Sequence, residues 1–363
     1  MIAALTPRER VSLALRELYQ TYGYRQYRMS KFEEYDLYAR NRNFLTDDHI
    51  LTFSDLNGKL MALKPDVTLS VIKNTRSESG TRKLWYTENV YRVPRHADSF
   101  QEIVQTGLEC IGHVDLYTMG EVLMLAARSL ETVGKDYVLC LSHMGILTGV
   151  LRSGGVPEER AGELLTAVGE KNLHTLRALC GEAGVPPETA ELLSRLCALD
   201  GPAAETLPEL LALSLPAESR AAAEELSDIC GLLPVFGEYQ VALDLSVIDD
   251  TDYYNGLLFR GFVAGAARPV LSGGRYDHLL HRMGRSGSAV GFAVYLSELE
   301  RLLTESRDCD ADTLLVYGPE DDPAAVAAAA RAAAEQGSVR VQLRGEGGAI
   351  GRRRIGPDGR EAE

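Results

Sequence analysis

The sequence lacks the features that usually mark a secreted, membrane-bound or zinc-binding protein. Its six cysteines form no Cys-x-x-Cys pair, and their spacing suits no zinc site. The N-terminus has no apolar signal-peptide core, and no window approaches the ~18 apolar residues that a membrane-spanning helix needs. We therefore expect a cytoplasmic protein with free, buried thiols and no membrane contact.

Motifs for nucleotide binding or covalent catalysis are also missing. The chain has no G-x-x-x-x-G-K-[ST] phosphate loop and no G-x-S-x-G nucleophile elbow. A glycine cluster at residues 345–351 follows a predicted strand, but its spacing does not fit a dinucleotide-binding loop. His278 and His281 lie beside Asp277, yet no nearby fourth metal ligand is evident. We expect no cofactor and no metal.

Positive charge is in short supply. The 363-residue chain carries 38 Lys and Arg against 52 Asp and Glu, a formal net charge of −14. Such a field repels phosphate backbones and argues mildly against tRNA as a partner. The hydrophobic content of 45% is ordinary for a globular protein, and the length suits two or three domains.

Apolar periodicity predicts a mixed α+β fold. Thr6-Pro7-Arg8-Glu9 reads as a capping box that starts an amphipathic helix. Residues 50–63 alternate around an Asn-Gly pair, which is a strong hairpin signal. Residues 84–93 and 103–111 read as strands, and Asp115 can cap the helix that follows.

Composition divides the chain further. Residues 144–235 are rich in Leu, Ala and Glu and predict an all-α insertion, because short helical stretches alternate there with Gly and Pro breaks. Strand signals return beyond it, so residues 1–143 and 236–303 form one core with an antiparallel sheet. Residues 304–344 read as a small α/β unit, and residues 345–363 as a flexible tail.

Two early segments carry residues suited to binding a small polar ligand. In Leu63-Lys64-Pro65-Asp66-Val67-Thr68, a carboxylate and a hydroxyl could hold an ammonium group. Taken alone, this segment favours a helix N-terminus capped by Asp66 or Thr68. In the second segment, Arg92 is followed by Gln105 and Glu109. The last two lie four apart on a predicted strand, so they face the same side and can converge on one ligand. The alternative for this pair is a solvated sheet face.

A third segment, Asp252-Tyr253-Tyr254-Asn255-Gly256, is followed by Gly273-Gly274-Arg275-Tyr276-Asp277. From residue 6 to 303, the chain resembles histidyl-tRNA synthetase. The resemblance implies a class II aminoacyl-tRNA synthetase-like antiparallel sheet flanked by helices, and a homodimer built through the first helix and strand region. It also assigns a histidine-binding-like pocket to Asp66, Thr68, Arg92, Gln105, Glu109, Tyr253 and Tyr254.

The chain departs from that family where cations are needed. Asp249 stands where the family has an arginine, Glu298 stands at the arginine of motif 3, and residues 95–102 lack the Gly-Arg-x-Arg pattern of the motif 2 loop. Adenylation develops negative charge on phosphate and needs preorganised cations. We therefore expect no aminoacylation and no catalytic residues.

A synthetase-like core with these losses resembles the regulatory subunit of ATP phosphoribosyltransferase. That resemblance implies a non-catalytic protein in the first step of L-histidine biosynthesis. It also implies a short-form catalytic subunit as partner in a hetero-octamer, and L-histidine as feedback effector. A divergent histidyl-tRNA synthetase and a free-standing histidine sensor remain as alternatives.

Overall fold

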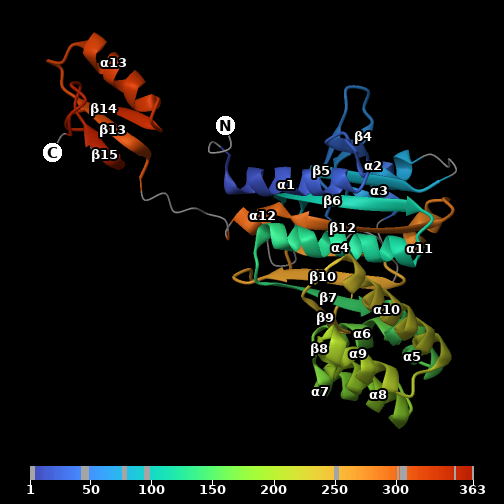
Figure 1. Cartoon of the computed structure of the whole chain (residues 1–363). Coiled ribbons are helices and arrows are strands. Elements are labelled where there is room, and N and C mark those ends of the chain that lie inside the picture. The colour runs from blue at the N-terminus through green and yellow to red at the C-terminus, as the bar shows by residue number, and fades with distance from the viewer. Residues whose placement is uncertain are drawn as a thin grey trace. The chain divides into compact units, whose positions relative to one another are not determined.

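The structure is a computed structural model that describes residues 5–41, 49–75, 80–93, 99–248, 253–300, 302, 309–346 and 349–361. The chain forms two compact units, Met1–Leu303 and Thr304–Glu363, whose helices and strands are labelled in Figure 1. Within the described ranges, no helix is both long and apolar enough to cross a membrane.

A nine-stranded sheet organises the first unit, in the order β1-β5-β6-β12-β11-β10-β7-β9-β8. Its neighbours pair antiparallel, except β1 with β5 and β7 with β9, which are parallel. The strands are β1 (Arg25–Gln26), β5 (Arg82–Arg92), β6 (Gln101–Gly112), β7 (Tyr137–His143), β8 (Asp200–Pro202), β9 (Val241–Asp244), β10 (Leu257–Val263), β11 (Leu271–Arg275) and β12 (Ser288–Tyr295).

The two main helices of the core begin where the sequence predicts. Helix α1 (Pro7–Thr21) has the capping box formed by Thr6 and Glu9, and α4 (Leu116–Val133) starts with the carboxylate of Asp115 accepting from the backbone N–H of Thr118 at 2.8 Å. Both predicted caps are confirmed. Two short helices follow strands directly: α11 (Asp277–Arg282) after β11, and α12 (Leu296–Glu300) after β12.

Helices α1 and α4 cover one face of the large sheet. Tyr19 of α1 lies edge-on to Phe292 of β12, with ring centroids 6.0 Å apart, and its hydroxyl lies 3.0 Å from that of Ser129 on α4. Alternate residues of β6 and β12, such as Leu108 and Val290, are buried in the same apolar cluster. Because side chains alternate across a strand, the intervening residues point to the opposite face.

A small sheet with strand order β2-β4-β3 brings a short helix to that opposite face. Its strands are β2 (Phe32–Glu34), β4 (Leu60–Leu63) and β3 (Thr52–Ser54), accompanied by helices α2 (Tyr35–Ala39) and α3 (Thr68–Asn74). Ser54 pairs with Leu60 across the turn, which confirms the predicted hairpin. Leu69 and Ile72 of α3 pack in one cluster with Tyr276 and Ala289, so α3 begins against the large sheet.

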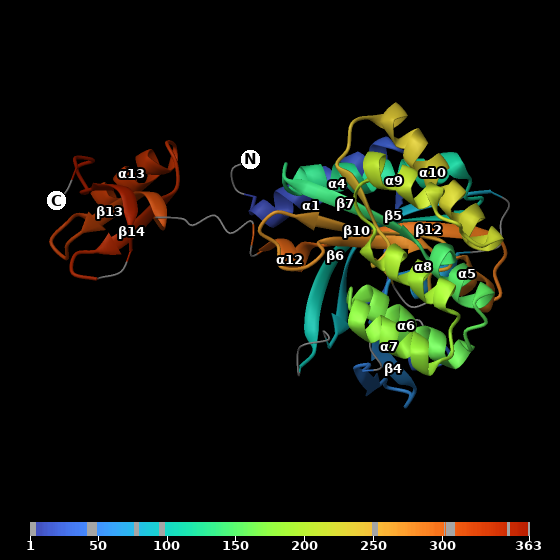
Figure 2. The ribbon, with the colours of Figure 1, turned by 90° about the horizontal axis from the view of Figure 1, so that it is seen from below.

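In the sequence, six helices and β8 separate β7 from β9, and we call them the helical insertion. Its helices are labelled in Figure 2. They are α5 (Met144–Ser153), α6 (Glu158–Gly169), α7 (Leu173–Glu182), α8 (Pro187–Ala198), α9 (Ala203–Ala212) and α10 (Ala217–Phe236).

The second unit is a three-stranded parallel sheet with one helix. Strands β13 (Ala311–Tyr317), β14 (Val339–Leu343) and β15 (Gly351–Ile355) lie in the order β14-β13-β15, and α13 (Pro323–Ala334) connects β13 to β14. The prediction of a flexible tail over residues 345–363 is wrong for residues 351–355. They form β15, because Ile355 packs into the small core with Leu315 and Ala333. The stretch is mostly polar, so its composition gave no indication that Ile355 would be buried.

Candidate functional site

The polar face of the large sheet positions the predicted ligand-binding pair. Glu109 and Gln105 lie two pleats apart on β6 and point away from α1 and α4. Glu109 is opposite Gly291 of β12, where an added Cβ would lie 2.0 Å from its Oε2 atom. Glycine at 291 therefore leaves room for the carboxyl group within the sheet.

Glu109 is almost fully buried, with 2% of its surface exposed. Its Oε1 accepts from the hydroxyl of Thr68 at 2.7 Å, and its Oε2 accepts from the hydroxyl of Tyr276 at 2.6 Å. Burial raises the pKa of Glu109 to about 8, despite these two hydrogen bonds. The carboxyl group is therefore mostly protonated at neutral pH, and a cation or N–H donor beside it would favour its ionisation.

Asp66 lies next to Glu109 at the start of α3. Its Oδ1 accepts from the backbone N–H of Leu69 at 2.8 Å, and its Oδ2 is 3.6 Å from Nη2 of Arg92. Burial raises the pKa of Asp66, while Arg92 and the N–H groups at the start of α3 oppose that shift. Asp66 therefore satisfies a backbone N–H in the first turn of α3, whose N-cap residue is Val67, and its charge helps to raise the pKa of Glu109.

Arg92 also holds the chain segment that carries Asp66. Its Nε donates to the backbone carbonyl of Pro65, so its guanidinium supports both the carboxylate and the backbone beside it. Part of the hydrogen-bonding capacity of Arg92 is therefore used by groups of the protein itself.

Three tyrosines form one wall of the site. The rings of Tyr253 and Tyr254 are 4.5 Å apart, and those of Tyr253 and Tyr276 are 6.1 Å apart. Burial, with the nearby charge of Asp66, raises the pKa of Tyr253 well above its ordinary value. The pKa of Tyr276 is raised likewise by burial and by Glu109. The hydroxyls of Tyr253 and Tyr276 are therefore neutral donors or acceptors, suited to a polar ligand with an aromatic or planar part.

Gln105 sits at the other end of the same face. It is 3% exposed and pairs across the sheet with Glu88 on β5 and Tyr295 on β12. The structure thus gathers Asp66, Thr68, Glu109, Arg92, Tyr253 and Tyr254 into one cluster, with Gln105 further along the same face.

Sequence reasoning missed three polar residues of this region. Tyr276 was part of a quoted motif but received no role, although it bonds Glu109 directly. Lys64, only 1% exposed, forms an ion pair with Glu88 of β5. Both charged residues stand close in sequence to predicted site residues, since Lys64 lies two residues before Asp66 and Glu88 lies four before Arg92. No pattern in either segment, however, shows that the residue after β4 meets β5.

Some sequence predictions lie outside the described residues. These are Asp249 and the part of the motif 2 loop at residues 95–98. Glu298 is described and belongs to α12, directly after β12. Across the described ranges, no group of three or more His, Cys, Asp or Glu side chains is arranged to hold a metal ion.

Two members of the His-Asp trio considered for a metal, Asp277 and His281, make contacts that hold the protein together. Asp277 accepts from the backbone N–H of Ala289 at 2.8 Å and from Nε of Arg275 at 2.8 Å. His281 Nε2 lies 2.9 Å from the backbone carbonyl of Gly287. These contacts fix α11 against β12.

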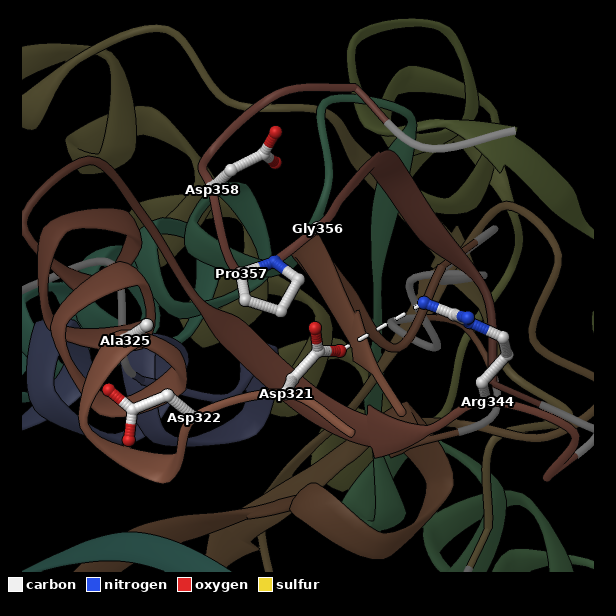
Figure 3. A pocket seen from close by; sticks show the side chains of 7 residues that line it. All are labelled: Asp321, Asp322, Ala325, Arg344, Gly356, Pro357 and Asp358. Atoms are coloured by element: carbon white, nitrogen blue, oxygen red, sulfur yellow. Dashed lines mark ion pairs between the residues drawn. The ribbon is translucent and has the colours of Figure 1, made fainter. Parts of the chain in front are cut away.

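The second unit has a surface hollow of about 480 Å³ at the carboxyl ends of its strands (Figure 3). Its carboxylates are engaged by the chain itself. Asp321 accepts from the backbone N–H of Gly318 at 2.6 Å and lies 3.9 Å from Arg344, and Asp322 caps α13. We interpret these groups as structural. The lining residues are Asp321, Asp322, Ala325, Arg344, Gly356, Pro357 and Asp358.

Comparison with known proteins identifies the class. A profile described as histidyl-tRNA synthetase matches residues 3–299. The crystal structure of an ATP phosphoribosyltransferase regulatory subunit/histidyl-tRNA synthetase from Bacillus halodurans superposes with a TM-score of 0.77. It shares 24% identity and covers 93% of this chain and 89% of that one. The fold is class II synthetase-like, as predicted.

Curated relatives narrow this class. An ATP phosphoribosyltransferase regulatory subunit from Desulforamulus reducens is 31% identical over 312 residues, covering 83% of this chain and 77% of the relative. A protein of the same name from Alkaliphilus metalliredigens is 28% identical over 289 residues, covering 77% and 73%. The chain therefore belongs to the family of ATP phosphoribosyltransferase regulatory subunits, whose core is that of histidyl-tRNA synthetase.

Proposed function

We propose that this chain is a non-catalytic regulatory subunit that binds L-histidine in the pocket around Glu109. In this role it activates a short-form ATP phosphoribosyltransferase catalytic subunit and makes the first step of histidine biosynthesis sensitive to histidine. The observation that carries the proposal is the buried carboxyl group of Glu109 between the hydroxyls of Thr68 and Tyr276.

The chemistry of that pocket matches the polar groups of histidine. A ligand with an imidazole and an ammonium group offers N–H donors on two sides, which suit two separate carboxyl groups. Glu109 would receive the imidazole N–H, while Asp66 and Thr68 would meet the ammonium group. The tyrosine wall formed by Tyr253, Tyr254 and Tyr276 gives the planar ring an apolar surface.

Loss of adenylation follows from charge. The transition state of that reaction spreads negative charge over phosphate oxygens and depends on fixed cations. The sequence has acidic residues, Asp249 and Glu298, where the synthetase resemblance calls for arginine. An anion at either position would raise the barrier, so we expect binding of the amino acid without its activation.

The partner is inferred from the names of the relatives, which are regulatory subunits of ATP phosphoribosyltransferase. A regulatory subunit requires a catalytic subunit, so we propose a complex with the short-form enzyme. The proposed assembly is a hetero-octamer built on homodimers of this chain. Histidine would inhibit by binding one state of that complex more tightly than the other.

The decisive experiment mixes this chain with a short-form catalytic subunit. We expect co-elution in size-exclusion chromatography, a rise in phosphoribosyltransferase activity, and inhibition of that activity by histidine. Glu109→Gln should preserve co-elution and activation but remove the inhibition. Failure to co-elute, with no effect on activity, would contradict the proposal. Robust histidine-dependent ATP–pyrophosphate exchange by this chain alone would instead indicate a synthetase. Tight histidine binding by a chain that joins no catalytic subunit would indicate a free-standing sensor.

A further inference from the structure

A chain of ion pairs links the helical insertion to the pocket. Glu225 lies on α10, and its Oε1 accepts from Nη1 of Arg275 at 3.1 Å, while its Oε2 is 3.2 Å from Nε2 of His143. His143 is the last residue of β7, and Arg275 is the last residue of β11. One carboxylate of the insertion therefore contacts the ends of two core strands.

A backbone N–H group fixes the tautomer of His143 in this contact. Nδ1 of His143 accepts from the N–H of Gly145 at 3.1 Å, so Nε2 carries the hydrogen and donates it to Glu225. That hydrogen bond from His143, with the charge of Arg275, lowers the pKa of Glu225. Glu225 is consequently an anion at neutral pH and a full partner for the guanidinium of Arg275.

Arg275 also contacts the two segments that carry the three tyrosines, one at residues 253–256 and the other at residues 275–277. Its Nε donates to Asp277 at 2.8 Å, and its backbone carbonyl accepts from the N–H of Asn255 at 3.2 Å. The N–H of Asp277 donates to Oδ1 of Asn255 at 3.1 Å. Asn255 follows Tyr253 and Tyr254 directly, and Tyr276 lies between Arg275 and Asp277. The two tyrosine-bearing segments are thus clamped together beside Arg275.

The insertion holds Glu225 firmly on its side of the contact. Helices α5 and α10 pack closely, since an added Cβ at Gly149 would lie 2.5 Å from Oγ of Ser219. Ser219 Oγ also donates to the carbonyl of Ile146 at 2.8 Å, and the N–H of Met144 donates to the carbonyl of Gly256 at 2.9 Å. A shift of α10 would therefore carry Glu225, the start of α5 and the Asn255–Gly256 turn together.

We propose that Glu225 is a positioning residue of the pocket. Through Arg275 it holds Tyr276 on Glu109 and fixes the turn after Tyr253 and Tyr254, so the helical insertion is part of the ligand site. The identity of the ligand rests on the proposed function, whereas the positioning of these segments does not.

The first test needs no ligand. In Glu225→Gln, amide hydrogen exchange of the segments around residues 253–256 and 275–277 should rise about tenfold relative to the unaltered chain, because their clamp loses its charge partner. Lys171→Met is the matched control. Lys171 joins the insertion to Asp244 of β9 at 3.1 Å, near the edge of the sheet, and its loss should leave exchange in both segments unchanged. Equal exchange in the two variants would overturn the proposal.

The second test uses histidine and calorimetry. Glu225→Gln should weaken histidine binding about tenfold, whereas Lys171→Met should not change it. Because Glu225 acts in part through Tyr276, the double variant Glu225→Gln/Tyr276→Phe should lose less affinity than the sum of the two single losses. Additive losses would show that Glu225 does not act through Tyr276 and would overturn the proposal. If the unaltered chain binds no histidine, the proposed function fails, and the exchange experiment still decides the positioning.

Discussion

The hydroxyl of Tyr276 lies 2.6 Å from Oε2 of Glu109, so a residue on the segment after β11 satisfies a carboxyl group in the middle of β6. The opposite oxygen is satisfied by Thr68 from α3. Three parts of the chain, more than 150 residues apart at the extremes, meet on one buried acid. The stability of the protein and its proposed ligand binding therefore share one group.

Replacing Glu109 should flatten the dependence of stability on pH. The pKa of Glu109 is raised from 4.5 to about 8 in the folded protein. Between these values the folded state keeps a proton that the unfolded state has lost, so the free energy of unfolding falls as pH rises through this window. Glu109→Gln removes that contribution. Urea denaturation from about pH 5 to pH 9 should show a smaller decline for the variant than for the unaltered chain. Parallel curves would contradict the raised pKa.

Gly291→Ala should damage the site by steric conflict. The new Cβ would lie 2.0 Å from Oε2 of Glu109 and 2.5 Å from the carbonyl of Leu108, so β12 or the carboxyl group must move. We expect a loss of about 2–3 kcal/mol in stability and weaker histidine binding by calorimetry. Gly162→Ala on α6 is the control, because nothing lies within 4 Å of its added Cβ. That change should stabilise the helix by about 0.5–1 kcal/mol. Equal changes in stability for Gly291→Ala and Gly162→Ala would contradict the steric conflict at Gly291.

The buried ion pair of Lys64 and Glu88 should be costly to break from one side. Lys64→Met would leave Glu88 without its cation beside the pocket, and we expect a loss of roughly 3 kcal/mol in urea denaturation, since Glu88 remains partly exposed to water. The double variant Lys64→Met/Glu88→Gln should recover much of that loss because no unpaired charge remains. A double variant as unstable as Lys64→Met alone would mean that packing, and not charge, sets the cost.

The second unit should depend on the end of the chain. Ile355 is 7% exposed and packs against Leu315, so Ile355→Ala should cost about 2–4 kcal/mol and speed hydrogen exchange across β13. Ile350 is 61% exposed, and Ile350→Ala should leave exchange unchanged. Unaltered exchange in Ile355→Ala would indicate that β15 contributes little to this sheet.

The core elements were predictable because their signals are local. The capping box at Thr6, the hairpin before Leu60 and the cap at Asp115 each depend on residues a few positions apart. Strand periodicity likewise placed Gln105 and Glu109 on one face. The prediction of a flexible tail was wrong because its signal was not local. Three consecutive arginines and several glycines gave the stretch a polar composition, whereas the burial of Ile355 depends on pairing with the distant β13.

The site itself could be predicted only in part. Asp66, Thr68 and Glu109 were assigned by resemblance, and their convergence depends on packing of α3 against the large sheet. Contacts made across long stretches of sequence, such as Glu225 with Arg275 and Lys64 with Glu88, leave no periodic pattern in either segment. Their charges alone would suit the surface equally well.

The parallel pairing of β7 with β9 has a consequence for how the helical insertion can vary. Antiparallel neighbours can be joined by a turn of two residues, but parallel neighbours need a crossover of a dozen or more. The helices from α5 to α10 are that crossover. The crossover requirement fixes neither their number nor their sequence, but replacing them with a tight loop would leave β9 unable to reach its place beside β7.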